Sequence, residues 1–447
     1  MPIAGRNPRV CYGLGASMSR PLRLSLLLLV AALVAPAAVP APAVAASGPC
    51  IPEYPSGSQC TVWKGKVRDV GDGDTLDAAI PGDGLGGLLR VRIIGIQAME
   101  QTSYRAAQRA GDCHAVDATN RLEALVKRSK KRIRVASLYP ESRSRGRRLR
   151  SIAVFFKGRW RDVGRLMVAE GRALWWPGRS EDATNVRYSV LAQRAAAARK
   201  GLFAPNACGI GPNEGHPLKL WVNWDADGPD SQDVNGEWVR IRNLDPVNPL
   251  PLTGWYLRDS LLRRFTFPAG SVLAPGQWTN IYAGEGQNFG AEFFWNQPSP
   301  VFENTTRDDR GFGDGAYLFD PQGDIRASMI YPCRINCADP NAGLVSMDAN
   351  PRGNEVVSIR NNASWPIALE NYLLKTVPYS YAFAPGTVLN AGETMRVFTK
   401  GDPAEDTALE RHWGMTSEIL DNGGDSVTLV SYTDVNLACT AWGSKSC

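Results

Sequence analysis

Short runs in the first half of the chain alternate apolar and polar residues, a pattern typical of β-strands that bury one face. The strand-like runs are 67–70, 75–80, 88–96, 133–138 and 151–156. Leu, Val and Ala recur at helical spacing over 103–129, 162–171 and 184–200. Because strands and helices are segregated along the chain, the pattern predicts an α+β fold built on a small barrel or curled sheet.

After residue 215 the chain changes to short β runs separated by Gly, Pro, Asn and Asp, and these runs repeat. The segment 236–243 returns as 354–361, and 267–276 returns as 383–392. Two copies of one β-sandwich of roughly 110 residues account for the repeat. The second half is therefore expected to be all-β.

Charge divides the chain at the same place. Residues 61–210 hold 29 Lys and Arg against 14 Asp and Glu, whereas 211–447 hold 17 against 29. A turn-rich segment at 205–213 lies between the two halves. With 447 residues and 44% hydrophobic residues, the composition excludes a largely disordered chain and favours several domains. The basic half is the part expected to meet a polyanion.

An apolar stretch at 24–39 follows two arginines and precedes small residues near Ala45 and Ala46, the pattern of a cleaved signal peptide. A retained membrane anchor is the alternative, but the stretch is short for a span and is interrupted by Pro36 and Pro40. We therefore expect a secreted, extracellular protein with no membrane span after cleavage. The expected segments are a signal peptide at 1–46, an N-terminal segment at 47–60, a first domain at 61–210, and sandwiches at 215–333 and 334–447.

Cleavage there leaves eight of the nine cysteines, and an exported chain favours disulfides over free thiols. Cys50 with Cys60 and Cys113 with Cys208 are plausible pairs, although the sequence does not fix the connectivity. A zinc site at Cys333 and Cys337 is the rival interpretation, but no second close pair or nearby histidine completes it.

One stretch of the basic half carries residues suited to cleaving a phosphodiester. Asp72-Gly73-Asp74 can direct two oxygen ligands at a hard cation such as Ca²⁺, because Gly permits a tight backbone between them. Arg92 can bind a phosphate through two N–H groups, and Glu100 can take a proton from water. A lone Asp-Gly-Asp-Thr is more often only a turn.

Four motifs in order around these residues resemble the staphylococcal nuclease (thermonuclease) family over about 61–204. They are Val70-x-Asp72-Gly73-Asp74-Thr75, Val91-Arg92-Ile93-Ile94-Gly95-Ile96-x-Ala98-x-Glu100, Arg150-Ser151-Ile152-Ala153-Val154-Phe155 and Leu166-Met167-Val168-Ala169-Glu170-Gly171-Arg172-Ala173. The resemblance implies an OB-like five-stranded β-barrel with helices and Ca²⁺-dependent cleavage of DNA and RNA. By position it implies Asp74 as a calcium ligand, Arg92 and Glu100 as catalytic residues, and Arg150 as the second catalytic arginine.

The chain departs from the family's wording at two positions. Gln97 replaces a metal-binding carboxylate, and its amide oxygen can still coordinate calcium with less charge. Met99 replaces the proline before Glu100. The second arginine is also ambiguous, because Arg147 follows Gly146 and competes with Arg150 for the role. With Arg148 and Trp175, Arg147 is otherwise expected to contact nucleic acid, although a tryptophan after a helix is more often a core residue.

The repeated half resembles the lamin-tail domain, which implies an immunoglobulin-like sandwich. The resemblance rests on Glu237-Trp238-Val239 before Asn243, on Leu252-Thr253-Gly254-Trp255-Tyr256-Leu257, on a Phe-Pro-x-Gly corner and on a late Gly-Asp-x-x-x-Leu strand. In the second copy the Gly-Trp pair has become Glu370-Asn371. Neither copy shows a cluster of catalytic residues, so these domains are expected to be binding or spacer modules of unknown ligand.

The expected function is that of a secreted calcium-dependent nuclease that hydrolyses DNA and RNA with little sequence preference. One alternative is a catalytically impaired barrel that only binds nucleic acid, as OB-like folds can. Another makes the two sandwiches primary and the protein a surface-attachment factor.

Overall fold

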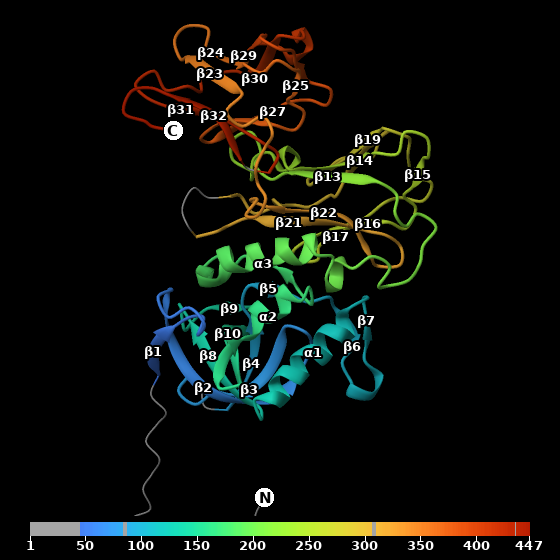
Figure 1. Ribbon diagram of the computed structural model, residues 1–447, viewed down its shortest axis with the longest axis vertical. Coiled ribbons are helices and arrows are strands. Elements are labelled where there is room, and N and C mark those ends of the chain that lie inside the picture. The colour runs from blue at the N-terminus through green and yellow to red at the C-terminus, as the bar shows by residue number, and fades with distance from the viewer. Residues whose placement is uncertain (1–44, 84–86, 306–309, 434) are drawn as a thin grey trace, which may run out of the picture. The chain divides into compact units, whose positions relative to one another are not determined.

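The computed structural model describes residues 45–447 except 84–86, 306–309 and 434 (Figure 1). The predicted signal peptide lies almost entirely outside these residues. Across the part of the chain that is described, no helix is long and apolar enough to cross a membrane.

Five strands of the N-terminal region close into a barrel, as the sequence predicts. β10 pairs in parallel with β4 and antiparallel with β8, and β8 pairs with β2, which completes the ring β2-β3-β4-β10-β8. This arrangement is compatible with an OB fold. The barrel strands are β2 (Gln59–Val70), β3 (Thr75–Ala79), β4 (Leu88–Ile93), β8 (Arg132–Ser137) and β10 (Arg147–Phe156).

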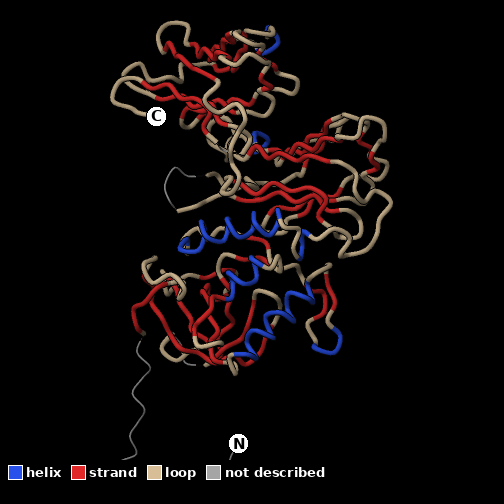
Figure 2. The backbone as a smooth tube through the Cα atoms, in the orientation of Figure 1, coloured by secondary structure: helices blue, strands red, loops and turns tan. Residues whose placement is uncertain are grey.

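The three α-helices of the described chain all lie in this region, and the rest is strands and loops apart from single 3-10 turns (Figure 2). The helices are α1 (Ala115–Arg128), α2 (Val163–Ala169) and α3 (Asn185–Ala197), with 3-10 turns η1 (Ala106–Gln108), η2 (Asp182–Thr184) and η3 (Gly201–Phe203). Short strands accompany them: β1 (Ala46–Pro49), β5 (Ile96–Gln97), β6 (Gln101–Ser103), β7 (Ala110–Gly111), β9 (Arg143–Ser144), β11 (Arg159–Asp162) and β12 (Leu174–Trp175).

The helix expected over 103–129 begins only at Ala115. The residues before it form the β6–β7 hairpin instead. At Gly111 a Cβ atom would lie 2.4 Å from the carbonyl oxygen of Glu100, so the chain passes too close to its neighbour for a helix with side chains. The apolar spacing that suggested a longer helix belongs to α1, whose Leu122 and Leu125 are fully buried in the barrel core.

The internal repeat is confirmed as two sandwiches of the same topology. The first has sheets β13-β14-β19-β20 and β17-β16-β21-β22, and the second has β23-β24-β29-β30 and β27-β26-β31-β32. The first comprises β13 (Leu218–Asn223), η4 (Val234–Gly236), β14 (Trp238–Asn243), β15 (Leu250–Pro251), β16 (Tyr256–Asp259), β17 (Arg264–Thr266), β18 (Val272–Leu273), β19 (Trp278–Tyr282), β20 (Glu292–Phe294), β21 (Asp314–Phe319) and β22 (Ile325–Tyr331). The second comprises β23 (Val345–Asn350), β24 (Val356–Asn361), β25 (Ile367–Ala368), β26 (Leu373–Thr376), β27 (Tyr379–Ala382), β28 (Val388–Leu389), β29 (Thr394–Lys400), η5 (Pro403–Glu405), β30 (Glu410–Met415), β31 (Ser426–Val430) and β32 (Asn436–Ala441).

A buried glutamate has the same structural role in each copy. Glu237 accepts hydrogen bonds from the backbone N–H groups of Val301 and Phe302, and Glu355 accepts from those of Ile419 and Leu420. Each carboxyl group thereby satisfies amides of an irregular segment that no strand pairs. This need explains why the motif around the glutamate is repeated.

Four disulfides link the eight cysteines of the described chain. Cys50–Cys60 and Cys113–Cys208 are the predicted pairs, and both are confirmed. The other two join Cys333 to Cys337 and Cys439 to Cys447. The first of these replaces the zinc alternative, because both sulfur atoms are used in the bond.

The two glutamates differ in a way that pH should expose. Only Oε2 of Glu237 has hydrogen-bond partners, and burial raises the pKa of Glu237 to about 8. The folded state therefore holds a proton that the unfolded state releases near its ordinary pKa of 4.5, and this contribution to stability falls as pH rises from about 4.5 to about 8. We expect Glu237→Gln to gain stability relative to the unsubstituted protein over that interval.

The measurement is the difference in unfolding midpoint between E237Q and the unsubstituted protein at pH 5 and pH 8.5. Glu355→Gln is the matched control, because both oxygens of Glu355 accept N–H groups and an amide NH₂ would meet a donor. It should lose stability at both pH values. A difference for E237Q that does not change with pH would contradict the expectation.

Candidate active site

The turn between β2 and β3 presents the two aspartates of the predicted site. The backbone N–H of Gly71 donates to Thr75 O at 2.9 Å, and that of Asp74 donates to Asp72 Oδ1 at 3.0 Å. Gly73 has an ordinary φ, but a Cβ there would lie 2.6 Å from Ala118 and 2.7 Å from Ala98. Glycine is therefore required because the turn presses against α1 and the segment after β5.

A buried ion pair joins Asp74 to Arg92, whose side chains are 2% and 4% exposed. β3 and β4 bring the two together, since Thr75 lies opposite Arg92 in the antiparallel register. The second oxygen of Asp74 accepts from Ala98 N at 2.8 Å, and Arg92 Nη2 donates to Ile96 O at 3.0 Å. The ion pair thus fixes the backbone at Ile96 and at Ala98, on either side of Gln97 in the segment that leads to Glu100.

Gln97 connects this ion pair to Glu100. Its backbone is held by β5, where it lies opposite Leu174 of β12. Its Oε1 accepts from Arg92, and its Nε2 donates to Glu100 Oε1 at 3.0 Å and to Ala98 O at 3.1 Å. The amide of Gln97 accepts from a guanidinium through its oxygen and donates to a carboxylate through its nitrogen, whereas an ionised aspartate can only accept and would repel Glu100.

Glu100 is exposed, yet its backbone is fixed on both sides. Its carbonyl oxygen accepts from Asp112 N at 3.0 Å, which ties it to the end of the β6–β7 hairpin. Met99, at the position where the predicted resemblance has proline, is 3% exposed and packs in a cluster with Tyr256 and Phe319 of the first sandwich. Packing of an apolar side chain therefore replaces proline in fixing this turn.

Two further side chains belong to this site. Arg147 donates from Nη1 to Thr75 Oγ1 at 3.2 Å. Tyr104 is 54% exposed, and its pKa is raised by partial burial and by the charges of Glu100, Asp72 and Asp74, while the charge of Arg147 lowers it. Those electrostatic effects place Tyr104 beside the charged cluster. No sequence signal pointed to Tyr104.

The two aspartates of the turn interact unfavourably with each other. Burial raises the pKa of Asp72 to about 7, and the negative charge of Asp74 is the second cause. A positive charge close to the pair would favour the ionised form.

Three predicted residues are not brought to the site. Arg150 is fully buried and donates to both oxygens of Asp83 at 2.8 and 2.7 Å, so it has no face for a substrate. Arg148 is 5% exposed and donates to Pro140 O and Glu141. Trp175 is fully buried in the barrel core and cannot stack on a base. The prediction that these three side chains contact substrate or nucleic acid therefore disagrees with their burial.

Strand geometry explains the error over the second arginine. Side chains alternate between the two faces of a strand, so Arg147 and Arg150, three positions apart on β10, point in opposite directions. Arg147 shares its face with Thr75, whereas Arg150 lies against Asp83 and above the Trp63 ring. An offset by one residue likewise separates buried Trp175 from half-buried Trp176, whose ring centroid is 5.8 Å from the Arg92 guanidinium carbon.

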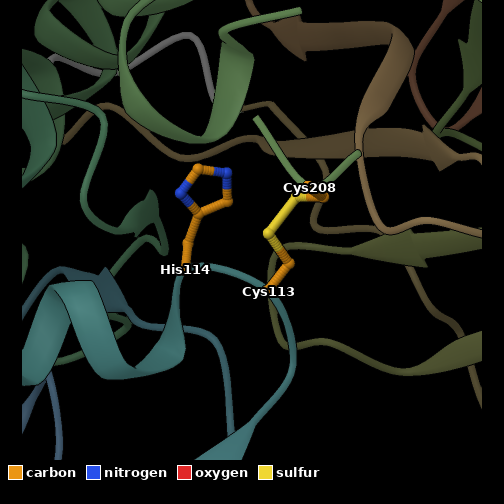
Figure 3. A group of neighbouring side chains, drawn as sticks. All are labelled: Cys113, His114 and Cys208. Atoms are coloured by element: carbon orange, nitrogen blue, oxygen red, sulfur yellow. A yellow bond between two sulfur atoms is a disulfide. The ribbon is translucent and has the colours of Figure 1, made fainter. Parts of the chain in front are cut away.

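One group of cysteine and histidine side chains lies close enough together to suggest a metal centre, but a disulfide rules it out. Cys113, His114 and Cys208 lie together, as Figure 3 shows, but the two sulfur atoms are bonded to each other. Among the described residues no other three His, Cys, Asp or Glu side chains bring their ligand atoms this close. The disulfide also removes Cys113 as a nucleophile.

The predicted calcium ligands fit a cation only in part. Asp72 and Asp74 supply two neighbouring carboxylates whose mutual repulsion a cation would relieve. Gln97 Oε1 already accepts from Arg92, and the two oxygens of Asp74 accept from Arg92 and from Ala98 N, so either residue would have to give up a hydrogen bond to hold the ion. Ca²⁺ usually takes six to eight oxygen ligands, so water, backbone or substrate oxygens would have to complete the shell.

The comparisons with known proteins bear on the second half of the chain. The lamin tail domain family model matches residues 223–332, which lie within the first sandwich. The match agrees with the predicted resemblance to the lamin-tail domain, and it does not extend to the barrel. A search of curated proteins finds no match.

The opposite environments of Arg147 and Arg150 predict opposite effects of substitution. Arg150→Met should destabilise the barrel by about 3–5 kcal/mol, because it leaves Asp83 buried without its partner. Arg147→Met removes one contact of a half-buried side chain and should cost about 1 kcal/mol or less. Urea unfolding measures the change in stability of both variants, and hydrogen exchange of the β8 and β10 amides measures its effect in the barrel. Equal losses for the two variants would contradict the placement of these side chains.

Proposed function

We propose that the protein is a nuclease that hydrolyses phosphodiester bonds at the cluster formed by Asp72, Asp74, Arg92, Gln97, Glu100 and Arg147. The observation that carries the proposal is one chain of hydrogen bonds, from Asp74 through Arg92 and Gln97 to the exposed Glu100. These bonds connect Glu100, the proposed general base, to the cation of Arg92, and Arg147 supplies a second positive charge at the cluster; a base close to positive charge supports phosphodiester hydrolysis.

In the proposed reaction Glu100 accepts a proton from a water molecule, whose oxygen attacks phosphorus and displaces the leaving oxygen of the ester. Gln97 holds Glu100 by donating to its Oε1. Arg147 stabilises the negative charge that develops on the phosphoryl oxygens, and Thr75 orients its guanidinium group. Arg92 holds Asp74 and Gln97 in place and adds positive charge behind them.

Calcium is the cofactor we propose, held by Asp72 and Asp74. When bound, such an ion supplies charge stabilisation to the phosphate and lowers the pKa of a water ligand. The substrates would be DNA and RNA, since the net charge of the barrel region suits a polyanion.

Secretion remains part of the proposal. Four disulfides favour an oxidising compartment, in agreement with the signal-like start of the sequence. The two sandwiches would act as binding or spacer modules. The first also supports the catalytic turn, because Tyr256 and Phe319 pack with Met99.

Binding of nucleic acid without cleavage is the second candidate function. The observation that favours it is the burial of Arg92, whose guanidinium group is engaged by Asp74, Ile96 O and Gln97 and is 4% exposed. A phosphate would have to displace one of these partners to reach Arg92.

We expect Glu100→Gln to reduce the rate of cleavage by about 10² or more without loss of folding, because the amide cannot accept a proton. The assay follows supercoiled plasmid and a single-stranded RNA with Ca²⁺ and then with a chelator. Glu141→Gln, which alters a carboxyl group that is 83% exposed in the same region, is the control and should retain full activity. Undiminished cleavage by E100Q would remove Glu100 from the mechanism, and retarded but intact DNA with the unsubstituted protein would favour the second candidate.

The role of Gln97 predicts a change in pH dependence. Gln97→Glu replaces the N–H donor by a negative charge next to Glu100, which favours the protonated carboxyl. The acid limb of kcat/KM should therefore move to higher pH, by roughly one unit. Gln97→Leu removes the same hydrogen bond without adding charge, so it should lower the rate and move the limb in the same direction by a smaller amount. A profile unchanged by Q97E would show that Gln97 does not act on the base.

A further inference from the structure

A second surface of the barrel combines aromatic rings with unpaired positive charge. It is a groove of about 570 Å³ on the outside of the barrel, which we call the Trp160 groove. Its floor holds Phe155 and Trp160, whose rings meet edge to face at 5.4 Å across the β10–β11 hairpin. Its rim holds Lys64, Lys66, Arg68 and Arg132.

The rim charges are not neutralised within the described protein. All four side chains are exposed, and none forms an ion pair with a described carboxylate. The β2–β8 register places Lys66 directly opposite Arg132, whereas Arg134, opposite Lys64, donates to the backbone carbonyl oxygens of Pro49 and Cys50. Like charges directly opposite each other destabilise a sheet, so this arrangement calls for a polyanionic ligand.

Asp69 is the nearest carboxylate in sequence to the rim, and it faces elsewhere. Its charge acts on Arg90 and Arg109, and it lies opposite Asp77 on β3. The positive rim therefore keeps its charge for a partner.

The floor identifies the class of polyanion. Phe155 is 36% exposed and Trp160 is half-buried, so ring surface is open at the base of the groove. Bases of a single strand stack on such rings while its phosphates meet Lys and Arg at the rim. Duplex DNA keeps its bases inside the helix, and an anionic lipid headgroup has no ring to stack.

We infer that the Trp160 groove binds single-stranded nucleic acid. The groove is separate from the catalytic cluster, because β3 runs from Thr75 at the cluster to Ala79 in the groove lining, about 13 Å along the strand. A nucleic-acid strand bound in the groove would therefore extend past the bond that is cleaved at the catalytic cluster. The inference rests on the proposed function only for the choice of nucleic acid as polyanion, and binding can be measured without cleavage.

The test uses the full chain with a chelator present and a fluorescent dT20 or a 20-bp duplex as probe. Trp160→Ala should weaken binding of dT20 by about 5-fold or more, the effect of losing one base–aromatic contact. Lys66→Glu with Arg132→Glu should weaken it further and reduce the slope of log Kd against log salt by about 1.4, for two phosphate contacts. Trp160→Leu keeps an apolar side chain and repeats the test if the alanine variant folds poorly.

Matched controls separate a site from diffuse attraction. Arg199→Glu with Lys200→Glu makes the same charge change at the exposed end of α3, and Trp365→Ala removes a 52% exposed ring from the second sandwich. Both should leave the affinity for dT20 unchanged. Three results would overturn the inference. The first is equal weakening of dT20 binding by the α3 variant, and the second is equal affinity of the protein for duplex and single strand. The third is that the groove variants lose binding to anionic vesicles but keep binding to dT20. If the protein binds dT20 through the groove but does not cleave nucleic acid when calcium is present, the proposed nuclease activity is refuted and the groove inference stands.

Discussion

The buried ion pair between Asp74 and Arg92 is the interaction on which the candidate site depends. Neither charge is stable at such burial without the other, because each would lose its hydration and gain nothing in return. Asp74 belongs to the β2–β3 turn and Arg92 to β4. Asp74 also accepts from Ala98 N and Thr75 Oγ1, and Arg92 also donates to Ile96 O and Gln97 Oε1. One pair of charges thus determines where the chain can run between β4 and Glu100, and the orientation of Gln97 follows from it.

Close backbone approach is the second constraint on the same region. Gly73 lets the turn contact Ala118 of α1, and Gly95, at φ +77°, lets the end of β4 pass Thr184 and Tyr188. In both places a Cβ atom would meet a neighbour within 2.8 Å. The cluster is therefore held by packing against the helices as well as by charge, which gives an exposed glutamate a defined position on an otherwise short segment.

The sequence predicted much of this arrangement because its signals are local. Strand alternation lies within single elements, the Asp72, Asp74, Arg92 and Glu100 spacing lies within adjacent ones, and the repeat in the second half is a direct likeness between two segments. The choice between Arg147 and Arg150 depended on which side chains of β10 point toward Thr75 of β3. That orientation is set by the pairing of β10 with β4, nearly sixty residues earlier in the chain. The burial of Trp175 likewise depends on pairing distant in sequence, that of β12 with β5. The partner of Arg150, Asp83, carried no sequence signal because a buried ion pair needs no fixed spacing.

Gln97 changes the balance of charge at the site. Asp72, Asp74 and Glu100 lie at the same cluster as Arg92 and Arg147, and a carboxylate in place of Gln97 would add a fourth negative charge. Burial, and after it the charge of Asp74, already raises the pKa of Asp72. The added charge would strengthen attraction for a cation but would leave Glu100 without its donor. The amide does the reverse, because it gives up charge near the aspartates and holds the glutamate to Arg92 through two hydrogen bonds. In the proposed nuclease, this residue therefore favours an oriented base over a more strongly bound metal.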